Sequence, residues 1–90
     1  MERKYRTAYN QLKKLGVPVH EGGYNGDDTF RISGEDNHPV VWADYYHEGW
    51  RGGGSLLDDF GVNHKINAIL EKQGLYAEWE NTGVLGVAKM

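Results

Sequence analysis

Apolar positions between residues 3 and 15 recur at the three- and four-residue steps of an α-helix. The stripe consists of Tyr5, Ala8, Tyr9, Leu12 and Leu15. Gly16 follows directly and can take the left-handed conformation that ends a helix, and Pro18 blocks continuation. The pattern predicts an amphipathic helix over 3–15 with one buried face.

A shorter stripe predicts a second helix over about 62–73. The stripe consists of Ile66, Ile69 and Leu70. Asn63 is suited to cap the first turn, because its side-chain oxygen can accept a backbone N–H. Gly74 is expected to end this helix in a left-handed conformation.

Elsewhere apolar and polar residues alternate, which predicts strands. Three antiparallel hairpins are expected, over 17–33, 29–46 and 76–90. The first would turn at Asn25-Gly26, a dipeptide that accepts a type I′ turn. The third would turn around Gly83, which is free to take a positive φ there.

The order of these elements, α-β-β-β-α-β-β, predicts one α+β domain over 1–90. Its fold class is a two-layer sandwich, an antiparallel sheet of four to five strands with two helices on one face. The expected core consists of Tyr9, Leu12, Leu15, Ile32, Val41, Ile66, Ile69, Leu70 and Trp79. The glycine-rich stretch 49–61, GWRGGGSLLDDFG, would join the third strand to the second helix.

The absence of cysteine excludes a disulfide framework and a thiolate metal site. The first ten residues, MERKYRTAYN, carry charges with no apolar run behind them, so no signal peptide is expected. No stretch approaches the roughly 20 apolar residues that span a bilayer. We therefore expect a cytoplasmic protein without a membrane partner.

Charge is unevenly distributed along the chain, whose formal net charge is −3. Basic residues predominate in 1–19 and acidic residues in 20–60. An acidic centre disfavours direct phosphate binding there and would attract a basic partner. The alternative interpretation is that turns are rich in Asp and Glu because these residues solvate them.

Residue patterns typical of metal or cofactor sites are missing. The histidines, none of which are spaced i, i+4, are His20, His38, His47 and His64. No EF-hand calcium loop occurs either. We expect neither a metal nor a cofactor.

Residues that commonly carry catalysis are also sparse. Ser33 and Ser55 are the two serines, and the glycines before Ser55 lack the lysine of a phosphate-binding loop. A carboxylate pair for hydrolysis could be drawn from Asp44, Glu48, Asp58 and Asp59. Such pairs are common by chance, and we expect no enzymatic activity.

The stretch VVWADYYHEGWR, residues 40–51, is more suggestive, because Trp, Tyr and Arg dominate binding hot spots. We predict that residues 49–60 form an exposed, partner-facing connector. The alternative is that Trp42 and Trp50 belong to the core. The predicted partner-binding residues are Asp44, Tyr45, Tyr46, Glu48, Trp50, Arg51, Asp58 and Asp59.

These observations favour a small non-catalytic protein-binding module, such as a phage or mobile-element inhibitor of a host protein. It would act through an acidic and aromatic surface on a basic or nucleic-acid-binding protein, in the strongest version as a nucleic-acid mimic. One alternative is a nucleic-acid-binding protein that uses the basic first helix, with Arg3, Lys4, Arg6, Lys13 and Lys14. Another is a small hydrolase or ligand-binding domain at the glycine-rich loop.

Overall fold

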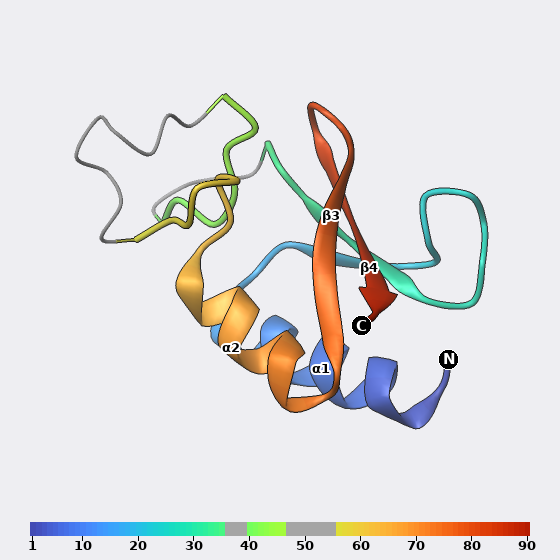
Figure 1. Ribbon diagram of the computed structural model, residues 1–90. Coiled ribbons are helices and arrows are strands. Elements are labelled where there is room, and N and C mark those ends of the chain that lie inside the picture. The colour runs from blue at the N-terminus through green and yellow to red at the C-terminus, as the bar shows by residue number, and fades with distance from the viewer. Residues whose placement is uncertain (36–39, 47–55) are drawn as a thin grey trace.

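A computed structural model describes residues 1–35, 40–46 and 56–90. The elements are α1 (Arg3–Leu15), β1 (Val19–Glu21), β2 (Phe30–Ser33), α2 (His64–Lys72), β3 (Leu75–Asn81) and β4 (Val84–Lys89). The strands form one antiparallel sheet in the order β1-β2-β4-β3. Both helices cover the same face of this sheet (Figure 1). The predicted α+β two-layer sandwich is confirmed, with four strands and the order α-β-β-α-β-β.

Both helices end where the sequence predicts. Gly16 has a φ of 102° and Gly74 a φ of 70°, so both are left-handed. After α1, Val17 N donates to Leu12 O over 3.0 Å and Gly16 N to Lys13 O over 3.1 Å, which is the pattern of a Schellman motif. Its hydrophobic contact explains why Val17 is buried.

At the start of α2, Asn63 acts as the predicted cap. Its side-chain Oδ1 accepts from Lys65 N over 2.9 Å, and its Nδ2 donates to Val41 O over 3.0 Å. The cap therefore also holds the segment 40–46 against the start of the helix. Because these polar groups are paired, Asn63 can be buried in an otherwise apolar region.

Two of the three predicted hairpins form, with turns that differ from the prediction. The strands β1 and β2 are separated by a loop over 22–29, in which Gly22 N donates to Thr29 O over 2.9 Å. Asn25-Gly26 lies within this loop and not at a two-residue turn. In the turn between β3 and β4, Gly83 does not have the positive φ that was predicted for it. A Cβ there would lie 2.7 Å from a carboxylate oxygen of Glu35, an exposed and flexible side chain that can move aside.

The predicted third strand, and with it the hairpin over 29–46, is wrong. The described residues 40–46 form only an isolated bridge, between Ala43 and Val62. β2 already pairs with β1 on one side and with β4 on the other, so it has no free edge for a third partner. The segment pairs with the chain before α2 instead, where Asn63 N donates to Trp42 O over 2.9 Å.

The core lies between the sheet and the two helices. Its largest fully buried side chains are Leu12, Phe30, Ile32, Ile66, Leu70, Leu75 and Leu85. Two predicted core residues are exposed: Leu15 to 40% and Val41 to 38%. Val17, just after α1, is buried in place of Leu15. Trp42 is buried in place of its neighbour Val41, which faces outward. Ile69 and Trp79 are partly buried at the core's margin.

Candidate functional site

Aromatic side chains from three separate segments meet at one side of the domain. The Tyr45 ring lies 5.3 Å from the Tyr46 ring and 5.5 Å from the Trp79 ring, in edge-to-face contacts. Trp79 Nε1 donates to Phe60 O over 2.7 Å. Tyr46 and Phe60 are each 75% exposed. Tyr45, Tyr46, Phe60 and Trp79 form what we call the aromatic surface, and the exposed Tyr76 on β3 lines the cleft beside it.

Backbone hydrogen bonds hold two of these segments together. Asp44 N donates to Gly61 O over 2.8 Å, next to the bridge between Ala43 and Val62. Gly61 has a φ of 83°, a conformation that an L side chain rarely adopts. The aromatic surface is thus built on paired backbone, although residues 40–46 and 56–63 contain no regular strand.

A cleft of about 280 Å³ lies between β3 and the segment 58–62. It is lined by Asp58, Phe60, Val62, Asn67, Tyr76, Ala77, Glu78 and Trp79. Its volume lies just below the roughly 300–1,000 Å³ of typical small-molecule pockets. A cleft of this size suits one inserted side chain better than a drug-sized ligand.

Asp58, predicted to contact a partner, also organises the turn that carries Phe60. Its Oδ1 accepts from Phe60 N over 2.8 Å and from Val62 N over 3.0 Å. Its Oδ2 accepts from Asn67 Nδ2 over 2.8 Å, which ties the turn to α2. The carboxylate therefore fixes the backbone of the exposed Phe60.

Three further carboxylates lie on the segments that carry the aromatic surface. Asp44 is half-buried, and its Oδ1 accepts from Tyr46 N over 3.0 Å in an Asx turn. Asp59 is exposed and, within the part of the chain that the structure describes, makes no hydrogen bond through its side chain. Glu78 lies on β3 at the margin of the cleft. A partner would meet aromatic rings flanked by negative charge.

Tyr76 and Glu78 form a local pair on β3. Tyr76 Oη donates to Glu78 Oε2 over 3.2 Å. The nearby Glu78 carboxylate raises the pKa of the Tyr76 hydroxyl above its ordinary value, because its charge repels the phenolate and it accepts a hydrogen bond from the neutral form. The Tyr76 hydroxyl thus stays protonated to a higher pH than a free tyrosine.

Replacing Glu78 by glutamine is expected to lower the pKa of Tyr76 toward the ordinary tyrosine value, because the repelling charge is removed. The pKa can be followed by the ¹³Cζ NMR signal of Tyr76 during an alkaline titration. Glu71→Gln, which removes an exposed carboxylate from α2, is the matched control and should leave the Tyr76 titration unchanged. Equal effects of the two substitutions would contradict the pairing.

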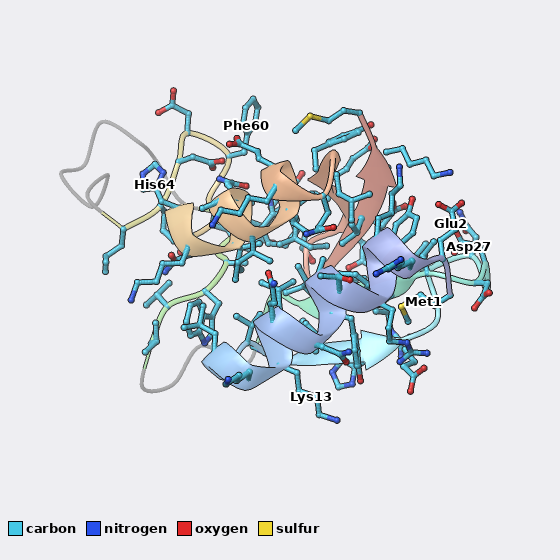
Figure 2. The ribbon with its side chains drawn as sticks, turned by 90° about the horizontal axis from the view of Figure 1, so that it is seen from below. Met1, Glu2, Lys13, Asp27, Phe60 and His64 are labelled. Carbon is cyan, nitrogen blue, oxygen red and sulfur yellow. The ribbon has the colours of Figure 1, made fainter. Side chains whose placement is uncertain are left out.

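The basic helix α1 does not contribute to the aromatic surface. Figure 2 shows Lys13 and Phe60 on opposite sides. The Lys13 ammonium and the Arg6 guanidinium each lie 5.7 Å from the centre of the Tyr9 ring. Part of this charge is thus engaged in cation–π contacts with its own helix.

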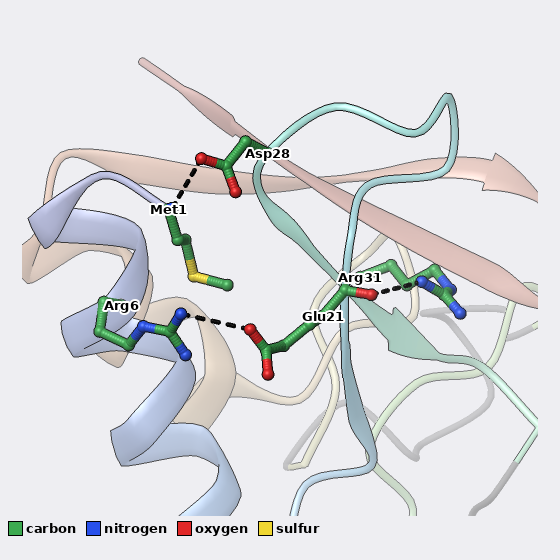
Figure 3. Close-up of polar contacts among 5 residues, drawn as sticks. All are labelled: Met1, Arg6, Glu21, Asp28 and Arg31. Carbon is green, nitrogen blue, oxygen red and sulfur yellow. Dashed lines mark hydrogen bonds and ion pairs between the residues drawn. The ribbon is translucent and has the colours of Figure 1, made fainter.

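Ion pairs also join α1 to the β1–β2 hairpin. Arg6 Nη2 lies 3.2 Å from Glu21 Oε1, and the amine of Met1 lies 2.6 Å from Asp28 Oδ2 (Figure 3). Arg31 Nη1 donates to Glu21 O over 2.9 Å. The Met1 and Arg6 pairs tie the hairpin to α1 and the residue before it, and the Arg6 pair reduces the cationic surface that α1 offers to a phosphate backbone.

Five of the predicted partner-binding residues come together here: Asp44, Tyr45, Tyr46, Asp58 and Asp59. The other three, Glu48, Trp50 and Arg51, lie outside the described residues, as does most of the predicted connector 49–60. Sequence reasoning placed Phe60 in the exposed connector 49–60 without naming it as a binding residue, and it missed the contribution of Tyr76, Glu78 and Trp79 on β3. The signal for Phe60 was its place two residues after Asp58, the spacing of an Asx turn, because turns usually lie at the surface.

Comparison of the chain with protein-family models, with curated proteins and with solved structures found no match. Among the described residues, no helix is long and apolar enough to cross a membrane. Within the same residues, no group of three or more His, Cys, Asp or Glu side chains is placed to hold a metal ion. The function is therefore inferred from the aromatic surface, its cleft and its carboxylates.

Proposed function

We propose that this protein is a small, non-catalytic protein-binding module that recognises its partner through the aromatic surface. The observation that carries the proposal is the exposure of Tyr46 and Phe60, each 75% accessible, on a support formed by Tyr45 and Trp79. Large apolar side chains that gather on one surface are typical of interaction sites. Aromatic anchors that are already fixed lose little conformational entropy on binding.

The charge around the aromatic surface supports a basic partner. Asp44, Asp59 and Glu78 lie on the segments that carry the rings, and positive groups on a partner would be drawn to them. A basic or nucleic-acid-binding host protein in the cytoplasm fits this chemistry. In that setting the module would act as an inhibitor of phage or mobile-element origin, and in the strongest version its carboxylates would stand in for nucleic-acid phosphates.

Site-specific photo-crosslinking tests the proposal. A benzophenone amino acid in place of Tyr46 should capture a partner from a cell lysate, whereas the same group in place of Lys13, on the opposite side, should not capture it. The captured protein is then purified and titrated with the unmodified module. Phe60→Ala should weaken the complex by about 30-fold or more, the hot-spot range of about 2 kcal/mol.

Tyr24→Ala is the matched control for Phe60→Ala. Tyr24 is an aromatic residue, 50% exposed, that lies in the loop between β1 and β2. It should leave the affinity unchanged, and both variants should keep the urea midpoint of the parent. Equal affinities of the parent and Phe60→Ala for the captured protein would refute the proposal, as would capture that is equally efficient from Tyr46 and Lys13.

A further inference from the structure

β3 presents an unpaired edge beside the cleft. It is the outermost strand of the sheet and, with seven residues, the longest one. No strand among the described residues pairs with its outer side. An unpaired edge offers a row of backbone N–H and C=O groups to an incoming extended chain. The cleft borders this edge along Tyr76, Ala77, Glu78 and Trp79.

Side chains of β3 alternate between two different surroundings. Ala77 and Trp79 are packed against the core on the helix-covered face. Glu78 and Glu80 are exposed and lie on the open face, but Glu80 is the extra residue of a β-bulge between Trp79 and Asn81, and its carboxylate lies over Gly86 of β4. A neighbouring strand would follow the same alternation. Along 76–79 it would thus meet apolar surface on one face and the Tyr76 ring and the Glu78 carboxylate on the other.

In two registers, the glutamates disfavour pairing between two copies of this chain. In an antiparallel pair of β3 strands centred on Glu78, this residue would face its own copy. In the next aligned register, Glu78 would face Glu80 of the other copy. Like charges directly opposite one another destabilise a strand pair. A strand with lysine or arginine at those positions would instead gain opposite-charge pairs.

We infer that the partner binds by adding an extended, basic segment to the outer edge of β3. Its alternate residues are basic and face Glu78 and Glu80, and an apolar residue between them enters the cleft beside Phe60 and Trp79. The backbone ladder supplies affinity and the alternating side chains supply specificity. This inference rests on the proposed function, because it assigns a binding mode to the same surface.

A synthetic strand tests the binding mode without the natural partner. The probe is the acetylated and amidated peptide Thr-Lys-Val-Lys-Phe-Lys-Thr, titrated into ¹⁵N-labelled protein and followed by amide NMR shifts. The shifts should be largest in Leu75–Asn81. A peptide with glutamate in place of lysine should bind at least about ten-fold more weakly, and the double variant Glu78→Lys/Glu80→Lys should reverse this preference.

A version of the lysine peptide that is N-methylated at alternate amides is the backbone control. It keeps the charges but cannot complete a ladder, so its binding should be lost. Equal binding of the methylated and unmethylated peptides would overturn the inference, as would shifts that spare β3. The captured partner separates the two proposals. If it binds Glu78→Lys/Glu80→Lys as tightly as the parent but fails to bind Phe60→Ala, strand addition is refuted and the proposed function stands.

Discussion

Replacing Phe30 by alanine is expected to lower the free energy of unfolding by about 3–5 kcal/mol. Phe30 lies on β2, is fully buried and meets the rings of Tyr5 and Tyr9 edge-on, at centroid distances of 6.5 and 5.5 Å. It therefore joins the sheet to α1. A domain of this size has a total stability of roughly 5–13 kcal/mol, so this one change removes a large part of it. Urea unfolding followed by circular dichroism measures the loss.

Phe60→Ala is the matched control, because it is the same chemical change at an exposed position. Its effect on the free energy of unfolding should stay within about 0.5 kcal/mol. Equal losses at Phe30 and Phe60 would show that the aromatic surface is part of the core. Such a result would also remove the basis for the binding proposal.

The parts of the fold that local chemistry determines could be predicted from the sequence. The stripe of α1 and the left-handed Gly16 require only helical periodicity and one glycine. The Asn63 cap is equally local. Hairpins between neighbouring strands also follow from alternation and short loops. All of these interactions join residues that are close along the chain.

The third strand could not be predicted correctly, because its fate depends on a distant pairing. The alternation in 40–46 is compatible with a partner strand, and β2 is the nearest candidate along the sequence. β4 takes that side of β2, with Ile32 opposite Leu85. Nothing in residues 29–46 encodes this competition. The same segment therefore packs Trp42 inward and leaves Tyr45 and Tyr46 at the surface.

The candidate site was predicted in composition but not in arrangement. Acidic and aromatic residues in 44–60 were expected to face a partner, and five of them do gather at one surface. The contribution of β3 was missed, because Trp79 fits the alternation of a core residue. It is in fact partly buried and supports Tyr45 and Phe60. Residues that serve core and surface at once do not stand out in a periodic pattern.

Asp58 and Asp59 are adjacent and chemically identical, and the sequence assigns them one role. Asp58→Ala is expected to lower the free energy of unfolding by about 2–3 kcal/mol, because hydrogen bonds to a charged group contribute about 1.5–3 kcal/mol each. Asp58 accepts three hydrogen bonds. The expected loss nevertheless stays near the value for one of them, because Asp58 is only half-buried. The substitution leaves the N–H groups of Phe60 and Val62 and the amide of Asn67 without this acceptor.

Asp59→Ala provides the control, since it removes an equal charge from an exposed side chain one residue away. Its stability should match that of the parent within about 0.5 kcal/mol. The two variants should also differ in NMR spectra. Asp58→Ala should shift the backbone amides of residues 58–62 and the indole N–H of Trp79, because Trp79 Nε1 donates to Phe60 O, whereas Asp59→Ala should shift only its neighbours. Equal stability losses would mean that the turn beneath Phe60 does not depend on Asp58, and the aromatic surface would lose its fixed support.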